Sequence, residues 1–491
     1  MSVTAAKGFV AAGGSVGIKA GGAADLAVVA TDDGRPVPAA GVFTANLATA
    51  APVQVSRAHL EATGGAAAAV VLTSGNANAA TGAAGVDAAR RLCQLVGDGI
   101  GSTTEQVLVC QTGLIGVPFP LAQVDPLVAK VVADRADTAA AGVAAAEAIM
   151  TTDTVRKEAV ASGPTAAGGR FTVGGMAKGA AMLAPNMATM LAVVTTDAEA
   201  DADVLLQVLR AAVGPSFNAM SIDGCTSTND TVLLLASGRA GPVAPEALQA
   251  AVTEVCTSLA DQMAADAEGA TKVGHVTVAG ATSDADAHAA ARKVADSLLV
   301  KCSLNGEDPY WGRVVSELGS AGVPFDLDKV SVAYGDVTVC ADGVAADHDA
   351  AAVAEHMAGR HVHIHCDLGL GTGSGVALFT DLGYGYIDGI EAAVRKYPLA
   401  GAKKDEVDKE PGYFLNNAPR MRYRWFRQCG LFVGSGVVEA GCKSVIGQRL
   451  KQSGMHWTVS GADSIIALRT AEASSQWEAT CRHRHNQTPA A

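Results

Sequence analysis

Hydrophobic positions in this chain follow two patterns that alternate up to about Asp388. Short runs rich in Val and Leu, such as AAAAVVLTSG ending at Gly75 and QVLVCQTG over Gln106–Gly113, are typical of buried strands. Longer Ala-rich stretches with apolar residues at helical spacing predict helices over Val86–Val96 and Pro245–Ala267. Strands that alternate with helices in this way predict an α/β or α+β protein.

Composition narrows the class of protein. With 491 residues, 49% of them hydrophobic, the chain can bury a large core. Aromatic residues make up only 4% while Gly numbers 55, so small side chains must fill that core and the layers must pack closely. A net charge of −13 disfavours nucleic acids and anionic membranes as partners, because such partners attract basic surfaces.

Cysteine usage and hydropathy indicate the compartment. The ten Cys are scattered without a CxxC pair, which disfavours both a disulfide framework and a zinc ribbon. The N-terminal apolar run is broken by Gly and does not resemble a signal peptide, and no apolar stretch is long enough to span a membrane. We therefore expect a cytoplasmic protein with reduced thiols and no membrane partner.

The segment most informative about catalysis is Gly174–Asp197, with the sequence GGMAKGAAMLAPNMATMLAVVTTD. Lys178 precedes a turn of small residues, and the pair Ala188–Thr189 follows just before an apolar strand. Strain at such a turn favours an N-to-O acyl shift, and cleavage would leave Thr189 with a free α-amine that can act as base for its own hydroxyl. The residues alone favour an ordinary strand threonine, because a Thr before an apolar run is usually just a strand residue.

A series of motifs in a fixed order favours the first alternative. They are GIK (17–19), DLA (25–27), GVFTANLATAAPV (41–53), SGNANAATG (74–82), QTGLIG (111–116), MTTDT (150–154), KGAAMLAPNMATML (178–191), SIDGCTSTNDT (221–231) and GEDPYWGR (306–313). In this set the chain resembles the ornithine acetyltransferase family, also called glutamate N-acetyltransferase, from Gly8 to about Asp388. The resemblance implies a layered α-β-β-α sandwich of the N-terminal-nucleophile type, self-cleaved into two chains that assemble as a heterotetramer of two alpha and two beta chains.

The resemblance also assigns the catalytic residues. Thr189 corresponds to the family's nucleophile and Ala188–Thr189 to its autocleavage site, which would divide this chain into pieces of 188 and 303 residues (491 − 188). Thr112 and Gly113 of QTGLIG correspond to the oxyanion hole, whose donors typically lower the barrier by about 3 kcal/mol each.

Substrate contacts carry over in the same way, onto Thr152, Lys178, Thr189 and Glu307. An amino-acid substrate carries both charges, so a Lys suits its carboxylate and a Glu suits its ammonium group. The implied reaction is a ping-pong transfer of acetyl from N-acetylornithine to glutamate, with ornithine released between the two half-reactions. It needs no metal or organic cofactor, and some relatives also use acetyl-CoA.

Three positions depart from the family pattern. Gln111 stands where Ser is usual, Cys225 where Asp is usual, and Tyr310 where Asn is frequent. None of them is a catalytic residue of the family, so we expect only modest tuning or loss of packing.

The end of the chain is foreign to this family. Three of the four Trp and a dense Arg set lie after about Gly389, and Gly412–Thr458 resembles the C-terminal part of DDE-type insertion-sequence transposases. There Glu439 would complete a metal-binding triad whose Asp residues are missing here, and a lone Glu cannot hold two metal ions. We expect three segments, 1–188, 189–388 and a mainly helical appendage over 389–491. An impaired fusion product with weak DNA binding is the alternative function.

Two further patterns imitate functional sites. HVHIH places His361, His363 and His365 on one face of a strand beside Cys366, but a half-exposed edge strand without a metal is expected, as in the matching family segment. GLGTGSG, over Gly369–Gly375, lacks the Lys of a phosphate-binding loop and is expected to be a turn between strands.

Overall fold

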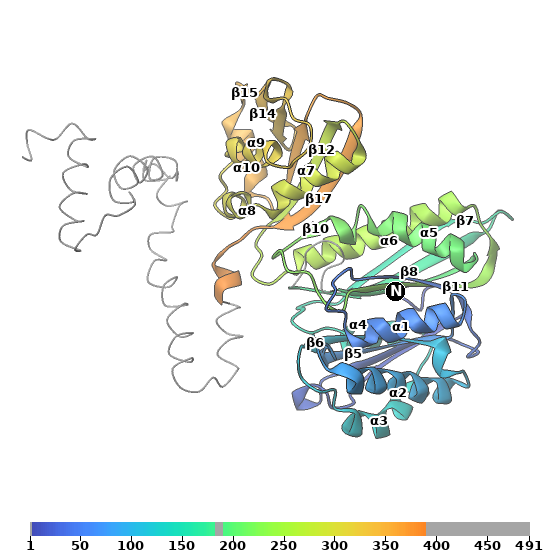
Figure 1. Ribbon diagram of the computed structural model, residues 1–491. Helices are drawn as coiled ribbons and strands as arrows, with labels where there is room; N and C mark the ends of the chain where they lie inside the picture. Colours follow the sequence, from blue (N-terminus) through green and yellow to red (C-terminus); the bar gives the residue numbers. More distant parts are fainter. Residues whose placement is uncertain (1, 182–189, 389–491) are drawn as a thin grey trace, which may run out of the picture. The chain divides into compact units, whose positions relative to one another are not determined.

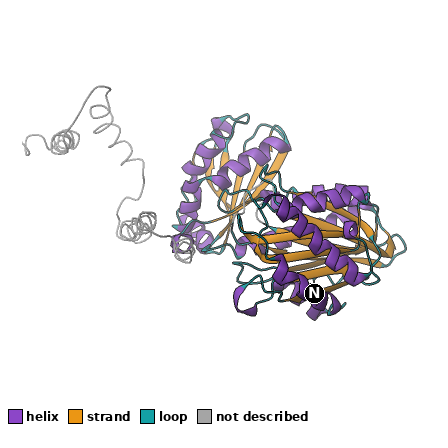
Figure 2. Ribbon diagram, turned by 60° about the horizontal axis from the view of Figure 1, so that its bottom comes forward, coloured by secondary structure: helices purple, strands orange, loops and turns teal. Residues whose placement is uncertain are grey.

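The computed structural model describes residues 2–181 and 190–388, which form sheets covered by helices (Figures 1 and 2). A four-stranded sheet has the order β1-β2-β5-β6, in which only the pair β5–β6 is parallel. Its strands are β1 Phe9–Gly14, β2 Leu26–Thr31, β5 Ala69–Asn76 and β6 Val107–Leu114.

A second sheet of six strands has the order β4-β3-β11-β9-β8-β7, with β9 and β11 parallel and the other neighbours antiparallel. Its strands are β3 Val37–Phe43, β4 Ala66–Ala67, β7 Lys157–Pro164, β8 Arg170–Lys178, β9 Leu191–Glu199 and β11 Thr231–Pro242.

A third sheet of seven strands has the order β10-β17-β12-β16-β13-β14-β15. Its strands are β10 Met220–Ser221, β12 Val273–Ala281, β13 Ser331–Tyr334, β14 Val337–Ala341, β15 Val344–Ala345, β16 His361–Asp367 and β17 Gly373–Thr380. The labelled α-helices are α1 Ala51–Ala62, α2 Gly82–Ile100, α3 Leu121–Ala133, α4 Ala139–Ala148, α5 Ala202–Val213, α6 Pro245–Ala265, α7 Asp284–Asp296, α8 Leu298–Asn305, α9 Trp311–Gly319 and α10 Ala350–Ala358.

Alternation along the strands explains how the first two sheets form layers. On β9, Leu191 and Val193 lie in a core shared by both sheets, whereas Ala192 and Val194 lie in a core shared with α5 and α6. Because successive strand residues point to opposite faces, each sheet is apolar on both sides. The outer face of the four-stranded sheet packs on α2 and α3. The order is therefore helices, sheet, sheet, helices (Figure 1), which confirms the layered α-β-β-α sandwich.

Elements predicted from hydrophobic pattern are confirmed with shifted ends. The strand predicted to end at Gly75 is β5, the strand over Gln106–Gly113 is β6, and the helix predicted over Val86–Val96 is the longer α2. The helix α6 ends at Ala265 instead of Ala267. The division at residues 188 and 388 stays a prediction, and the transposase-like segment lies outside the described residues.

The prediction of an edge strand for HVHIH is wrong. β16 lies inside the seven-stranded sheet, parallel to β12 and antiparallel to β13. Its odd positions, His361, His363 and His365, are exposed, while Val362 and Ile364 are buried against a helix-covered core. The alternation of His with apolar residues indicated correctly that one face of this strand is exposed to solvent. A strand inside a sheet can also have an exposed face, so the pattern did not show that the strand lies at an edge.

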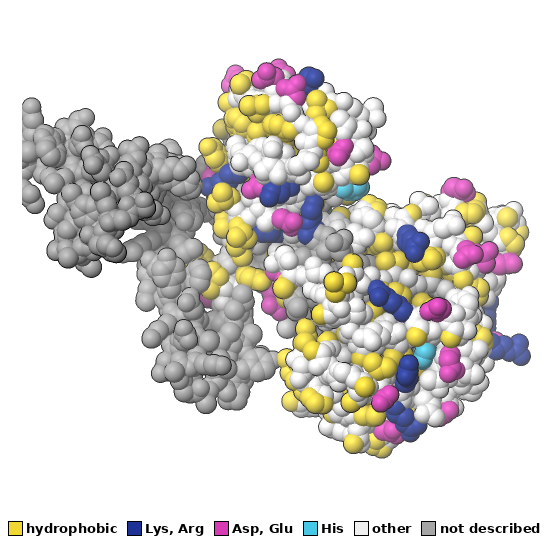
Figure 3. All heavy atoms as spheres, in the orientation of Figure 1, with side chains coloured by type: hydrophobic (Ala, Val, Ile, Leu, Met, Phe, Trp, Pro, Cys, Tyr) yellow, Lys and Arg dark blue, Asp and Glu magenta, His cyan; other side chains and the backbone are white. Residues whose placement is uncertain are grey.

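Two observations concern surfaces and membranes. Figure 3 shows basic and acidic side chains interspersed on the face of the described residues that it presents. Of the helices in the described ranges, none is long and apolar enough to cross a membrane.

Close packing between α4 and β1 yields a test of the fold. A side chain at Gly13 of β1 would place its Cβ 2.0 Å from the carbonyl oxygen of Ala144 in α4. We therefore expect Gly13→Ala to destabilise the protein by roughly 1–3 kcal/mol, as overpacking does. Gly214→Ala is the matched control, because Gly214 has a helical backbone and its nearest neighbour would be 3.6 Å away. Equal thermal unfolding midpoints for the two variants would contradict the packing described.

Candidate active site

Two residues far apart in sequence meet at the centre of the candidate site. Thr112, on β6, and Lys178, the last residue of β8, are both buried, and Lys178 Nζ donates to Thr112 Oγ1 at 3.3 Å. The contact crosses from the four-stranded to the six-stranded sheet. Since Oγ1 accepts this hydrogen bond, the Thr112 hydroxyl proton remains available to a third atom.

Gly113 must be glycine for a backbone reason. Its φ is 132°, a region that L side chains avoid, and a Cβ there would lie 2.2 Å from the backbone of Gly75. The adjacent strands β5 and β6 therefore approach closely where the loop turns outward, and Gly113 itself is exposed.

Buried charges surround Lys178. Burial lowers its pKa, and Asp153 opposes that shift. Burial would raise the pKa of Asp153, but the positive charges of Lys178 and Lys157 lower it to about 2. Lys157 is fully buried and pairs with Asp153 and Asp266, each at 2.5 Å. Two carboxylates and two ammonium groups are thus held away from water.

Asp153 also places the loop that carries Thr152. Its carboxylate accepts hydrogen bonds from Thr151 N at 2.9 Å and from Gly179 N at 2.8 Å. Thr152 is exposed, one residue before Asp153, and Gly179 directly follows Lys178. The structure therefore brings the loop of Thr152 to the end of β8. Beside this loop lies a hollow of about 700 Å³, lined by Glu147, Met150, Thr154, Val155, Arg156, Glu158 and Gln262.

Thr189 and Ala188 lie outside the described residues, but their neighbours do not. Met190 N donates to Asp230 Oδ1 at 2.9 Å, and Leu191 is the register partner of Lys178. Burial raises the pKa of Asp230 well above its ordinary value, while Lys178 acts in the opposite direction. The chain that follows Thr189 is therefore anchored directly beside Lys178.

Several of the sequence motifs meet in one buried network. Asn229 Nδ2 donates to Ala77 O at 2.7 Å and to Gln111 O at 2.9 Å. Gln111 Oε1 accepts from Asn78 Nδ2 at 2.8 Å, and Gln111 Nε2 donates to Thr73. Both polar atoms of the Gln111 side chain, where the family usually has Ser, are thus hydrogen-bonded. This network supports the backbone on either side of Thr112.

Glu307 lies in a different part of the site. Its φ of 53° is unusual for a residue with a side chain, and Oε1 pairs with Lys272 Nζ at 3.3 Å. Lys272 is anchored through its backbone N–H to Asp381, and the backbone N–H of Glu268, a few residues earlier, donates to Ala180 O. Segment 268–272 therefore connects Glu307 to the residues that follow Lys178. Of the remaining departures, Cys225 and Tyr310 are both exposed.

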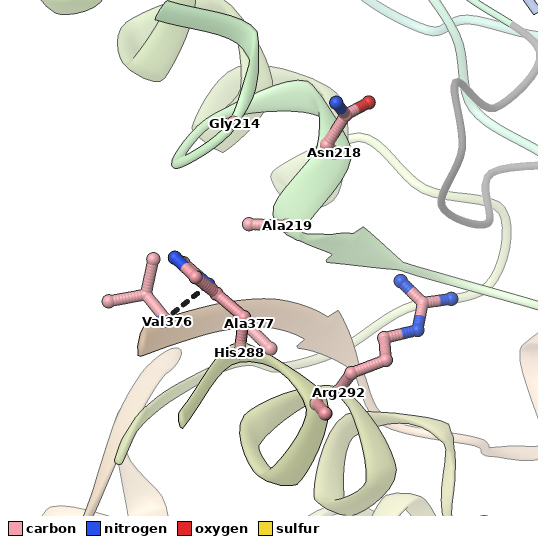
Figure 4. Close-up of a pocket in the computed structure, with 8 residues that line it drawn as sticks. Gly214, Asn218, Ala219, His288, Arg292, Val376 and Ala377 are labelled. Carbon is pink, nitrogen blue, oxygen red and sulfur yellow. Dashed lines mark hydrogen bonds between the residues drawn. The ribbon is translucent and has the colours of Figure 1, made fainter. Parts of the chain in front are cut away.

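A separate pocket of about 330 Å³ contains none of the predicted residues (Figure 4). In it Val376 N donates to His288 Nδ1 at 3.4 Å, while Arg292 is held by Met220 O and Asp296. The residues that line it are Gly214, Asn218, Ala219, His288, Ala289, Arg292, Val376 and Ala377.

The sequence analysis missed the residues that carry the site's charge balance. Asp153 lies in the motif MTTDT and Asp230 in SIDGCTSTNDT, so the sequence could have pointed to these two residues. Lys157 and Asp266 lie in none of the motifs. Burial of a Lys between two Asp residues depends on strands and helices that are remote in sequence.

Comparisons with known proteins agree along most of the chain. A family model described as the ArgJ family matches residues 10–395. The arginine biosynthesis bifunctional protein ArgJ of Thermobifida fusca is 47% identical over 352 residues, covering 71% of this chain and 88% of that protein. Its namesake from Mycolicibacterium paratuberculosis is 46% identical over 392 residues, covering 79% and 95%.

Solved structures were also found. The crystal structure of the bifunctional protein argJ from Bacillus halodurans matches 41% of this chain and 98% of its own, with 33% identity and a TM-score of 0.40. Ornithine acetyltransferase complexed with ornithine from Mycobacterium tuberculosis matches 38% and 94%, with 40% identity and a TM-score of 0.33.

Asp153 provides a test of the buried charges. Its folded pKa of about 2 lies below the ordinary 3.8, so the stability it contributes is complete above about pH 4 and is lost as the pH falls toward 2. We expect Asp153→Asn to cost about 3 kcal/mol at pH 7, because Lys157 and Lys178 lose a buried partner. The deficit relative to wild type should shrink below pH 4. Glu147→Gln, at an exposed ion pair, is the control, and a deficit that does not change with pH would contradict the assignment.

Proposed function

Because the chain belongs to the ArgJ family, we propose that it transfers the acetyl group of N-acetylornithine to glutamate in arginine biosynthesis, through an acetyl-Thr189 intermediate. The enzyme class is glutamate N-acetyltransferase. The observation that carries the proposal is the contact of Lys178 with Thr112 beside the anchored start of β9. Two residues that the resemblance assigns to the oxyanion hole and to the substrate contacts thereby lie together, and Leu191, two residues after the nucleophile, is the register partner of Lys178.

Self-cleavage comes first. Thr189 Oγ attacks the carbonyl carbon of Ala188, the peptide C–N bond breaks to give an ester, and water hydrolyses the ester to free Ala188. The new α-amine of Thr189 then takes the proton of its own hydroxyl. The hydrogen bond from Met190 N to Asp230 supports this step, because it fixes the backbone on the side of the chain that is retained.

Acetyl transfer follows in two half-reactions. Thr189 Oγ attacks the acetyl carbon of N-acetylornithine, the amide C–N bond breaks, and ornithine leaves with the proton held by the α-amine. Glutamate's amine then attacks the ester and releases Thr189 as the free hydroxyl. In both steps the developing oxyanion accepts from the Thr112 hydroxyl, which Lys178 orients, and from the backbone N–H of Gly113.

Substrate is held by Thr152, Lys178, Thr189 and Glu307. The buried ammonium group of Lys178 favours a carboxylate, since a desolvated charge gains most from an opposite charge. Glu307 pairs with Lys272 and offers the substrate ammonium a half-buried carboxylate. The proposed reaction uses no metal or organic cofactor, and acetyl-CoA, which some relatives accept, is the donor to assay beside N-acetylornithine. The active form is a cytoplasmic heterotetramer of two alpha and two beta chains.

Intact-mass analysis of wild type and Thr189→Ala tests the nucleophile. We expect wild type to appear as two chains and Thr189→Ala as a single uncleaved chain, because the variant lacks the attacking oxygen. Transfer from N-acetylornithine to glutamate should occur only with wild type. An uncleaved wild type, or a cleaved variant, would overturn the proposed mechanism.

Thr112→Val, made beside Thr189→Ala, tests whether the Thr112 hydroxyl stabilises the oxyanion during acetyl transfer. It retains shape but loses the hydroxyl, so kcat should fall by roughly 10²–10³ with little change in KM. Thr152→Val, at a proposed substrate contact, should instead raise KM.

The segment after residue 388 is proposed to be a transposase-derived appendage, in which Glu439 stands without sequence counterparts of the Asp residues that precede it in a full-length transposase. The resemblance to transposases over Gly412–Thr458 supports this proposal. Weak DNA binding as the main function is disfavoured, since the family match covers residues 10–395.

Replacing residues 389–491 by the C-terminal end of the Mycolicibacterium paratuberculosis relative tests the appendage. Cleavage should be unchanged, because it depends on residues around Thr189. In the family that the chain resembles, a short C-terminal tail supplies an Asn and a terminal Ser or Thr to the substrate pocket. We therefore expect kcat/KM for N-acetylornithine to rise about tenfold, the value of one restored polar contact. Unchanged turnover would show that the appendage does not impair the site.

A further inference from the structure

Lys19, the last residue of the GIK motif, is a half-buried cation that the proposed chemistry does not use. Its Nζ donates to Ala24 O at 2.9 Å and to Met150 O at 2.6 Å. An ammonium group has three hydrogens, so one of them remains for a further acceptor. Within residues 2–181 and 190–388 no carboxylate lies within ion-pair distance of Lys19. Only neutral carbonyl groups therefore bind this cation.

The two carboxylates that act on Lys19 electrostatically are bound to other groups. Asp25 accepts from three backbone N–H groups of the segment 16–19, at 2.6 to 2.9 Å. Asp153 accepts from two backbone N–H groups and pairs with Lys157. Burial lowers the pKa of Lys19, and Asp25 and Asp153 oppose that shift. A half-buried ammonium group without a paired anion is costly, and an anionic ligand would offset that cost.

The contacts of Lys19 place it beside the candidate site. A Cβ at Gly75 would lie 3.1 Å from Lys19 Cγ, and Gly75 is the register partner of Gly113. Met150, which accepts the hydrogen bond from Nζ, stands two residues before Thr152. Lys19 therefore contacts both the strand next to the proposed oxyanion hole and the loop of a proposed substrate contact.

Lys178 is a second ammonium group at the site that has no paired carboxylate. Its Nζ donates to the Thr112 hydroxyl, and among the described residues it forms no ion pair. Lys19 is bound to the start of the segment 150–153, and the end of that segment is bound next to Lys178, because Asp153 accepts from the backbone N–H of the following residue. Two ammonium groups therefore flank the same short segment.

The two substrates of the proposed reaction differ at the end of the side chain. Ornithine ends in an ammonium group, which suits Glu307, whereas glutamate ends in a second carboxylate, which Glu307 would repel. Glutamate therefore needs a further cation. Lys272 does not supply it, because its three hydrogens are taken by two backbone carbonyl groups and Glu307.

We propose that Lys19 determines the specificity for the acetyl acceptor, by binding the side-chain carboxylate of glutamate in the second half-reaction. This inference rests on the proposed acetyl transfer. The remaining hydrogen of Lys19 Nζ donates to that carboxylate, while Lys178 takes the α-carboxylate. N-Acetylornithine has no second carboxylate, so the first half-reaction does not depend on Lys19. The two cations together select an acceptor with two carboxylates over amino acids with one.

Two acceptors for the same acetyl-enzyme test the inference in the cleaved, full-length protein. With N-acetylornithine as donor, Lys19→Met should raise KM for glutamate by ~10–100-fold, the value of a lost hydrogen bond between charged groups. Transfer to isotope-labelled ornithine should change by less than about twofold, because ornithine has no side-chain carboxylate. Lys19→Arg keeps the charge and should lose less affinity for glutamate than Lys19→Met. Lys130→Met, at an exposed lysine of α3, is the control and should behave like wild type with both acceptors.

An equal loss with both acceptors would overturn the inference, because it would show that Lys19 only supports the segment 150–153. Glutarate, a dicarboxylate without an amine, separates this inference from the proposed acetyl transfer. Calorimetry should show that wild type binds glutarate at least ~10-fold more tightly than Lys19→Met does. A wild type that transfers no acetyl would contradict the proposed function, whereas equal glutarate affinity of the two proteins would refute the role of Lys19.

Discussion

The candidate site depends on the burial of Lys157 between Asp153 and Asp266. This ammonium group holds the loop after α4 against α6, and Asp153 holds the backbone after Lys178. Buried ion pairs add little net stability, but removing one partner is costly because the other is left charged and dry. The arrangement therefore acts mainly to specify position. Without it, Thr152 and Lys178 would have no fixed relation to each other.

Catalysis requires that water be excluded from these groups as well as that they be held in position. Lys178 and Thr112 meet between two sheets whose facing sides are lined with apolar residues. In such surroundings a fixed ammonium group and a hydroxyl stabilise a developing negative charge far better than they would in water. The same dehydration lowers the pKa of Lys178, and its negative neighbours counteract that shift. Ammonium groups and carboxylates offset one another in the site, which suits a substrate that carries a positive and a negative charge.

Much of this could be predicted from the sequence, and the limits have physical causes. Short apolar runs located β5 and β6, and apolar residues at helical spacing located α2 and α6, since local pattern determines which faces of an element are buried. Motif resemblance located Thr112 and Lys178, and the structure brings them into contact. The seven-stranded sheet was not anticipated as a separate layer, and HVHIH was assigned to an edge. Strand order depends on contacts between segments distant in sequence, such as β12 with β16, which no local pattern encodes.

The central claim is that acetyl passes through the residue that begins the second chain. The most direct measurement incubates cleaved protein with N-acetylornithine alone, quenches it rapidly in acid and determines the mass of each chain. The account predicts that the chain beginning with Thr189 gains one acetyl group, which fragmentation places on that residue and which glutamate removes. Acetyl on another residue, or transfer to glutamate without any acetylated chain, would contradict it.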